Sequence, residues 1–258
     1  MTGVDERVRA FGTRVRDGEP VLGYWVVLDA PAATERLARA GFDVLCLDAQ
    51  HGLFGYSGML AALQAIDAGG QAVGVVRVGA NDPAQIGRAL DAGAVGVIVP
   101  LVDSADEAAR AVEATRYPPR GTRSYGPMRA QLRIGPGLAD ADRSVLVFAM
   151  IETAAGLAQV ERICAVPGLA GVFVGPVDLR IALGGSGPTD PGVEAVFGAA
   201  LGRVVAAARA AGVVAGCYAP DGVTAAARLA QGFTLVTVGT DLSDLVAGAR
   251  AQLDAARA

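Results

Sequence analysis

Short apolar runs rich in β-branched residues recur along the chain, and an alanine-rich stretch follows each of them. Strands of a parallel sheet look like this because helices cover both faces of the sheet. Eight such pairs fit within 258 residues, a length typical of a closed (β/α)₈ barrel. We therefore predict an α/β fold, a TIM barrel, formed as one domain over residues 1–258. The expected strands are Leu22–Leu28, Val44–Asp48, Ala72–Val78, Gly96–Leu101, Ser144–Ile151, Leu169–Val174, Val213–Tyr218 and Leu235–Val238.

The expected helices begin and end at local signals. Asp82 precedes a proline, which suits a cap followed by the first helical residue. Ser104 and Glu107 have the spacing of a capping box, and glycines close several helices just before the next strand. An extra helix, Asp5–Asp17, is expected to cap the barrel bottom, and the long irregular stretch Arg116–Arg143 is expected to be functional. The other expected helices are Ala32–Ala40, Tyr56–Ala68, Pro83–Ala92, Ser104–Ala114, Ala155–Ala165, Pro191–Ala211, Gly222–Gln231 and Asp241–Arg257.

Charge and cysteine usage limit the partners. The net charge is −4, with acidic and basic residues mixed along the chain, so we expect no nucleic-acid partner, which would require a basic stripe. No apolar run is long enough to span a membrane, and the charged N-terminus lacks the apolar core of a signal peptide. The scattered Cys46, Cys164 and Cys217 indicate free thiols in a reducing compartment. We expect a cytoplasmic protein with no membrane partner.

Two absences restrict the chemistry. All 22 basic residues are arginines, so a lysine Schiff base is excluded. His51 is the only histidine, which excludes zinc sites built on several histidines. If the chain is an enzyme, its electrophile must be a metal ion, an arginine or a backbone dipole.

Polar residues end four of the expected strands, and the carboxyl ends of barrel strands are where catalytic groups gather. These residues are His51, Arg77, Glu152 and Asp178. The two carboxylates are hard oxygen ligands that suit Mg²⁺ or Mn²⁺. The metal and Arg77 would stabilise the enolate of a chelated 2-oxoacid, backbone N–H groups after Gly175-Pro176 would hold its carboxylate, and His51 would move the proton.

Each residue also has a structural interpretation. A carboxylate at a strand end is often a helix cap or an ion-pair partner, and a lone arginine is often a salt-bridge residue. Trp25, by size alone, favours barrel packing, and Asp91 favours a solvated helix surface. The four strand-end groups together are stronger than any one of them because each falls in register on its strand.

At these residues the chain resembles the class II pyruvate aldolases of the HpcH/HpaI aldolase/citrate lyase family, which include 4-hydroxy-2-oxoheptanedioate aldolase and 2-dehydro-3-deoxyglucarate aldolase. The resemblance extends from about Gly23 to Asp241, and the ordered set of motifs is highly specific. The motifs are Gly23-Tyr24-Trp25, Ala40-Gly41-Phe42-Asp43, Asp48-Ala49-Gln50-His51-Gly52, Val76-Arg77, Asn81-Asp82-Pro83, Ala114-Thr115-Arg116-Tyr117-Pro118-Pro119, Ile151-Glu152-Thr153 and Gly175-Pro176-Val177-Asp178-Leu179.

The resemblance implies a role for each matching residue. It implies cleavage of 4-hydroxy-2-oxoacids to pyruvate, or a related 2-oxoacid, and an aldehyde through a metal-stabilised enolate. Glu152 and Asp178 would bind the divalent cation, Mg²⁺ or Mn²⁺ with Co²⁺ as a further option. His51 would be the acid/base, partnered by Asp91 across a subunit boundary, and Arg77 would polarise the ketone. Residues expected at the substrate or directly behind it are Trp25, Gln50, Gly175, Pro176, Val177, Arg180 and Asp48.

The resemblance also implies a homo-oligomer, a hexamer or a dimer or trimer with shared sites, in which neighbours exchange the last helix, Asp241–Ala258. Four departures concern the aldehyde partner. Gln50 stands where many members have Glu, Arg180 replaces a small residue, Ser124 replaces Gly, and Tyr125–Pro136, which should shape the aldehyde side, matches no substrate class.

Three other functions remain open at this point. One is an acyl-CoA lyase of the same superfamily, although no basic, glycine-rich nucleotide surface is evident. The second is oxaloacetate decarboxylation, which uses the same enolate. The third, from another class, is a non-catalytic barrel that binds small molecules, against which the intact set of strand-end residues argues.

Overall fold

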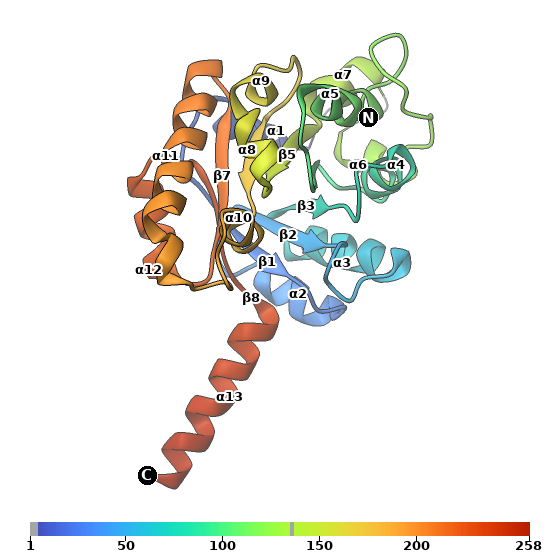
Figure 1. Ribbon diagram of the computed structural model, residues 1–258. Helices are drawn as coiled ribbons and strands as arrows, with labels where there is room; N and C mark the ends of the chain where they lie inside the picture. Colours follow the sequence, from blue (N-terminus) through green and yellow to red (C-terminus); the bar gives the residue numbers. More distant parts are fainter. Residues whose placement is uncertain (1–4, 135–136) are drawn as a thin grey trace.

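Eight parallel strands close into a barrel in sequence order in the computed structural model, which describes residues 5–134 and 137–258. Figure 1 shows the strands surrounded by helices. This arrangement confirms the predicted (β/α)₈ fold. The strands are β1 (Val21–Val26), β2 (Val44–Asp48), β3 (Val73–Arg77), β4 (Gly96–Val99), β5 (Leu146–Ile151), β6 (Gly171–Val174), β7 (Val214–Ala219) and β8 (Leu235–Thr240).

The helices follow the prediction except where the chain breaks a helix or adds a short one. The predicted Ala155–Ala165 helix is two helices that meet at Gln159, and Pro191–Ala211 begins as a 3₁₀ turn. Ser144 ends a helix, so its prediction as a strand residue was wrong. The helices are α1 (Glu6–Arg16), α2 (Pro31–Leu37), α3 (Tyr56–Gly69), α4 (Pro83–Asp91), α5 (Ala105–Thr115), α6 (Ala130–Arg133), α7 (Leu138–Ser144), α8 (Ala154–Ala158), α9 (Val160–Cys164), α10 (Pro176–Ala182), η1 (Pro191–Val193), α11 (Glu194–Ala211), α12 (Gly222–Ala230) and α13 (Asp241–Arg257).

The cap signals in the sequence are confirmed. The Asp82 carboxylate accepts a hydrogen bond from Gln85 N at 2.9 Å, and Ser104 Oγ accepts one from Glu107 N at 3.2 Å. The reciprocal half of the predicted capping box is shifted by one residue, since the Glu107 carboxylate accepts from the backbone of Asp103. These two helices therefore begin where local side-chain hydrogen bonds satisfy their first backbone N–H groups.

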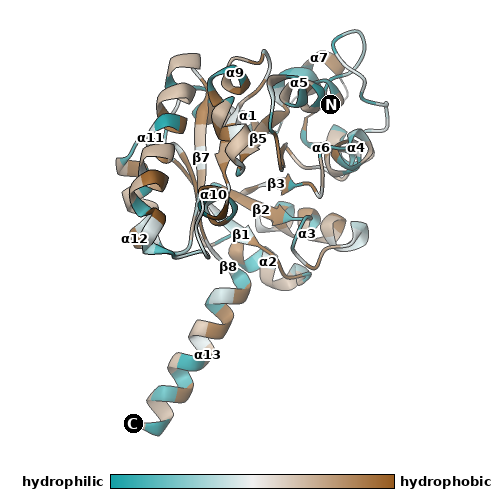
Figure 2. Cartoon of the chain, viewed as in Figure 1, coloured by the Kyte–Doolittle hydropathy of each residue, from teal (hydrophilic) through white to brown (hydrophobic). Residues whose placement is uncertain are grey.

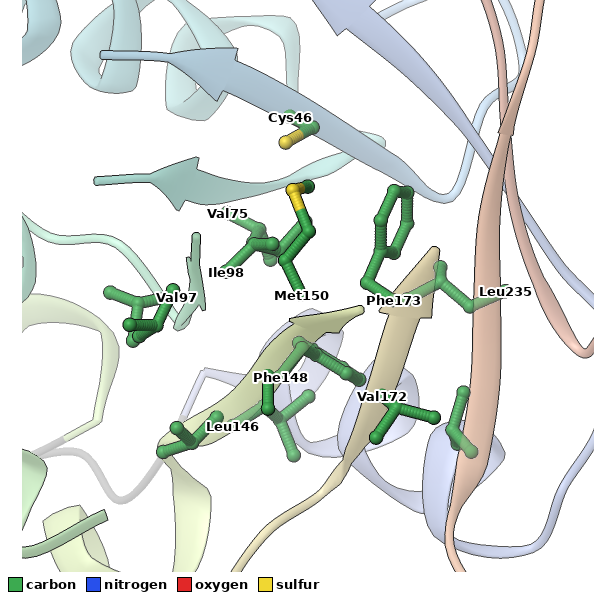
Figure 3. Packing of buried hydrophobic residues seen from close by; sticks show 14 of the residues in the cluster. Cys46, Val75, Val97, Ile98, Leu146, Phe148, Met150, Val172, Phe173 and Leu235 are labelled. Atoms are coloured by element: carbon green, nitrogen blue, oxygen red, sulfur yellow. The ribbon is translucent and has the colours of Figure 1, made fainter. Parts of the chain in front are cut away.

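The interior of the barrel is apolar below the site and polar at it. Cys46, Val75, Met150 and Phe173 belong to the buried core, and Figure 3 shows them projecting into the space that the strands enclose. Side chains two residues apart on a strand share a face. The next interior positions toward the carboxyl ends are therefore 48, 77, 152 and 175, so the strand geometry itself gathers Asp48, Arg77 and Glu152 above this apolar layer.

Two helices extend the barrel at opposite ends of the chain. α1 lies at the amino ends of the strands, where its Arg14 binds Asp43 just before β2 and its Phe11 and Val15 are buried. α13 projects away from the barrel (Figure 1), and it carries both apolar and polar residues along its length (Figure 2). Every α13 residue after Asp241 is exposed.

The segment Pro191–Ala211 has the length and apolar character of a membrane span, which the sequence analysis did not anticipate. Its Phe197, Leu201 and Val204 are buried, and α11 contacts α9, β6 and β7. The apolar face of this helix is therefore accounted for by packing on the barrel, as in the core helices of other α/β proteins.

Candidate active site

A cavity of about 380 Å³ opens at the carboxyl ends of the strands and is lined by several of the predicted site residues. Strand ends and the loops that follow β2 and β6 supply its walls. A larger hollow beside Tyr117 and Arg123 and a smaller one beside Tyr56 lie elsewhere and lack this set of groups. The lining residues are Trp25, Val27, Asp48, His51, Arg77, Met150, Phe173, Gly175, Pro176, Val177, Asp178, Tyr218 and Thr240.

Asp48 is the buried anchor of this cavity. Its Oδ1 accepts hydrogen bonds from Gln50 N, His51 N and Arg77 Nε at 3.0, 3.1 and 2.9 Å. Its Oδ2 accepts from Trp25 Nε1 and Arg77 Nη2. Burial by itself would raise the pKa of Asp48, but the hydrogen bonds and charge of Arg77 outweigh it and hold the pKa below its ordinary value. Asp48 is therefore a carboxylate committed to holding its neighbours in place.

Arg77 is aimed into the cavity by that carboxylate. Two of its three guanidinium nitrogens bind Asp48, and its Cζ atom lies 5.0 Å from the centre of the Trp25 ring. The third nitrogen, Nη1, faces the weak acceptor Sδ of Met150 at 3.9 Å. This nitrogen is thus positioned to donate to a substrate oxygen, while the planar group is fixed by the bidentate pair.

Glu152 directly follows β5 and is almost fully buried. Its Oε1 accepts a hydrogen bond from Leu101 N at 2.8 Å. Burial raises the pKa of Glu152, and the negative charge of Asp178 raises it further, against the opposing effects of the Leu101 hydrogen bond, Arg77 and His51. No arginine among the described residues forms an ion pair with Glu152. The group is a desolvated carboxylate that repels a second one nearby and would be stabilised by a cation.

Gly175 and Asp178 complete that part of the site. A Cβ atom added to Gly175 would lie 2.6 Å from Glu152 Oε2, so the absence of a side chain at Gly175 makes room for the carboxylate. Pro176 starts α10 directly after Gly175, and this turn brings Val177 and Asp178 into the cavity wall. Among the described residues, no cluster of three or more His, Cys, Asp or Glu is arranged to hold a metal ion. The candidate protein ligands at this site are therefore the two carboxylates of Glu152 and Asp178.

His51 lines the cavity, but Asp91 does not meet it within one chain. α4 runs antiparallel to the strands, so its last residue, Asp91, lies at the amino end of the barrel, opposite the cavity. There the Asp91 carboxylate accepts a hydrogen bond from Arg123 at 2.7 Å. The stretch between α5 and β5 lies at that same end, so within one chain Tyr125–Ile134 do not line the cavity; Gly135 and Pro136 lie outside the described residues.

Two other predicted site residues point elsewhere. The Arg180 guanidinium binds Glu194 at 2.6 Å and stacks 3.9 Å from the centre of the Phe197 ring, away from the cavity-lining set. Gln50 donates its backbone N–H to Asp48, and its Oε1 is buried without a hydrogen-bond partner among the described residues. The structure thus brings Trp25, Asp48, His51, Arg77 and Asp178 to the cavity wall with the Gly175–Val177 backbone, places the buried Glu152 directly behind Gly175, and leaves Arg180, Gln50 and Asp91 outside.

Sequence reasoning missed five residues of the cavity wall. Phe173 and Tyr218 contact Trp25, with ring centres 5.7 and 6.0 Å from the indole. Tyr218 and Thr240 lie at the ends of β7 and β8, so the strand-end criterion applied to all eight strands would have found them. The others are Val27 and Met150, which carried no polar signal.

The fold and the cavity define an α/β-barrel enzyme with an arginine, a histidine and two carboxylates at the carboxyl ends of its strands. The profile of the HpcH/HpaI aldolase/citrate lyase family matches residues 22–247, and the chain belongs to this family. It is accordingly assigned to the lyases.

Named relatives support this assignment over the whole chain. The chain is 41% identical over 243 residues to a hydroxypyruvate/pyruvate aldolase of Rhizorhabdus wittichii, covering 94% of this chain and 96% of the relative. It is 39% identical over 237 residues to a 4-hydroxy-2-oxovalerate aldolase of Rhodococcus jostii, covering 91% and 90%. A family structure from Burkholderia cenocepacia superposes with a TM-score of 0.89 at 37% identity, covering 96% of this chain and 99% of that one.

Proposed function

We propose that the protein is a divalent-metal-dependent class II aldolase that reversibly cleaves 4-hydroxy-2-oxoacids to an aldehyde and pyruvate or a closely related 2-oxoacid. The observation that carries this proposal is the cavity lined by Arg77, His51 and Asp178, with the buried Glu152 directly behind Gly175 and near enough for its pKa to respond to all three. The names of the aldolase relatives support the reaction class.

The residues present fit a hard divalent cation, Mg²⁺ or Mn²⁺ with Co²⁺ as an alternative. Glu152 and Asp178 would hold it, because burial and the negative charge of Asp178 raise the pKa of Glu152, and a bound cation would offset that repulsion. Two protein ligands leave coordination positions for water and for substrate oxygens, as these ions prefer. When bound, the cation supplies Lewis-acid stabilisation of negative charge on the 2-oxoacid.

The chain's own groups would do the rest. Arg77 donates from Nη1 to the ketone oxygen as that oxygen gains charge, and Asp48 keeps the guanidinium from turning toward Glu152. His51 takes the proton from the C4 hydroxyl, directly or through a water, the C3–C4 bond breaks to release the aldehyde, and the remaining enolate is protonated at C3 to give the 2-oxoacid. Backbone N–H groups of Val177 and Asp178 bind the substrate carboxylate, and Trp25, Phe173 and Tyr218 exclude water.

The oligomer is part of the proposal. Asp91 lies at the barrel end opposite the cavity of its own chain, so Asp91 could approach His51 only from a neighbouring subunit. A stripe of exposed apolar side chains along one face of α13, including Leu242, Leu245 and Val246, is left uncovered in the single chain. We propose a homo-oligomer, a hexamer or a smaller assembly of shared sites, in which α13 packs on a neighbour. We also propose a cytoplasmic location, which is supported by three buried free thiols of the kind found in reducing compartments.

Deuterium exchange of the pyruvate methyl protons tests the proposal directly, because it requires enolisation but no aldehyde. We expect exchange in D₂O that depends on Mn²⁺ or Mg²⁺, is abolished by a chelator, and is lost in Glu152→Gln. Full exchange in excess chelator would refute the metal-dependent scheme, and no exchange together with no Mn²⁺ binding would favour a non-catalytic binding barrel. Screening aldehydes against pyruvate and hydroxypyruvate would then identify the acceptor.

A further inference from the structure

Leu101 has a backbone conformation that a leucine ordinarily avoids. Its φ is +53°, and it is the only non-glycine residue with positive φ within residues 5–134 and 137–258. In this left-handed region the Cβ of an L-residue crowds the following carbonyl oxygen, so glycine, asparagine and aspartate are the usual occupants. Strained conformations of this kind persist only where the surroundings hold them.

Side-chain packing in the core does not hold Leu101 there. Leu101 is 57% exposed, so its burial within its own chain contributes little to stability. The segment lies just past β4, whose register with β5 pairs Val99 with Ala149. The backbone changes direction at this residue while its N–H faces Glu152.

The Leu101 N–H donates the hydrogen bond that fixes one oxygen of Glu152. Leu101 N donates to Oε1 at 2.8 Å, and no other hydrogen bond to this carboxylate is present within the described chain. Its other oxygen, Oε2, lies beside Gly175, where an added Cβ would be 2.6 Å away. The carboxylate is thus held from β4 on one side and given room by β6 on the other, with Oε2 turned toward the segment that carries Asp178.

We propose that the left-handed turn at Leu101 is a positioning device that presents Glu152 for cation binding. This inference rests on the proposed role of Glu152 as a metal ligand. Positioning Glu152 in this way requires the φ angle and the N–H of residue 101, but it does not require the leucine side chain.

The test is Mn²⁺ affinity, measured by electron paramagnetic resonance of free Mn²⁺ on the full-length protein, for three variants of the same residue. Leu101→Gly and Leu101→Asn keep the N–H and tolerate the left-handed region, whereas Leu101→Val keeps the N–H and an apolar side chain but disfavours it. We expect Gly and Asn to bind Mn²⁺ within about twofold of wild type, and Val to bind roughly tenfold more weakly, a factor that corresponds to about 1.4 kcal/mol.

The opposite order would overturn the inference. If Leu101 acts through its exposed apolar side chain, Val will resemble wild type while Gly and Asn lose affinity. Equal affinity in all three variants would equally sink it. Melting curves without metal show whether each variant is folded. If Leu101→Val does not fold, the Leu101→Gly and Leu101→Asn variants still test the inference. The proposed function fails separately, if wild type does not bind Mn²⁺ or if Glu152→Gln binds it as wild type does.

Discussion

Asp48→Asn is the substitution for which the structure gives the clearest magnitude. The carboxylate is 2% exposed and accepts five hydrogen bonds, three on Oδ1 and two on Oδ2. Asparagine keeps the size but offers one acceptor oxygen, so at least two buried donors lose their partner. Each unsatisfied buried donor costs about 1–3 kcal/mol.

The loss of charge leads to a similar figure. Arg77 is also buried, and removing one partner of a buried ion pair typically costs about 3–5 kcal/mol. We therefore expect Asp48→Asn to lower the free energy of unfolding by about 3–5 kcal/mol, a large share of the roughly 5–15 kcal/mol of a typical domain. The melting temperature should fall by roughly 6–20 °C, at about 2–4 °C per kcal/mol.

Urea unfolding at fixed protein concentration measures this, with Glu161→Gln as the matched control. Glu161 also binds an arginine, Arg203, through both oxygens, but both side chains are about half exposed, so its loss should cost no more than about 1 kcal/mol. Equal effects of the two substitutions would refute the reasoning that Asp48 is a buried anchor.

The pH dependence gives a second check. The folded-state pKa of Asp48 is lowered from 3.8, so its stabilisation is present above that value and is lost as pH falls through the folded pKa. The stability gap between wild type and Asp48→Asn should therefore narrow in strong acid. A gap that widens there would contradict the assigned role.

Three further predictions concern the site and its frame. Arg77→Ala should lower kcat/KM by about 10²–10³, or roughly 3 kcal/mol of transition-state stabilisation, measured by steady-state aldol cleavage; an effect confined to KM would argue against an oxyanion role. Gly175→Ala should weaken Mn²⁺ binding about 10- to 100-fold by displacing Glu152. Gly198→Ala in α11, where an added Cβ has nothing within 4 Å, is the control and should stabilise the fold by about 0.5–1 kcal/mol. Equal Mn²⁺ affinities of these two variants would contradict the prediction. Glu152→Gln should raise the melting temperature of the metal-free protein at neutral pH, because burial raises the pKa of Glu152 and so disfavours its charged form. The contribution of Glu152 to stability is favourable below its unfolded-state pKa and is lost as pH rises through its folded-state pKa. A lower melting temperature of this variant in EDTA would show that the charged carboxylate does not destabilise the fold.

Local patterns in the sequence were sufficient for the architecture. Short continuous apolar runs, each followed by an alanine-rich stretch, indicate parallel strands buried on both faces. Cap residues such as Asp82 and Ser104 act through hydrogen bonds within one turn, so the helix starts were predicted correctly. The short helices α6 and α7 were missed because neither has enough turns to show a periodic apolar face.

Part of the site was also within reach of the sequence, since strand-end positions share one face of the barrel. Arg77, Glu152, His51 and Asp178 were named on that basis; the structure brings Arg77, His51 and Asp178 to one cavity and buries Glu152 directly behind its Gly175 wall. Arg180 was placed there by its nearness in sequence to Asp178, but a helical turn directs it toward Glu194 and Phe197 instead.

The sequence by itself determined the barrel, the order of its strands and the kinds of group at their carboxyl ends, because these depend on periodicity and on residue type. Only the tertiary structure decided the partners of the acidic residues: Asp48 pairs with Arg77, and Glu152 accepts a hydrogen bond from Leu101 instead. It also decided that Asp91 lies at the end of the barrel opposite the cavity. Those pairings depend on strand register, closure of the sheet and the direction of single backbone turns, and such contacts between residues far apart in the chain leave no local pattern.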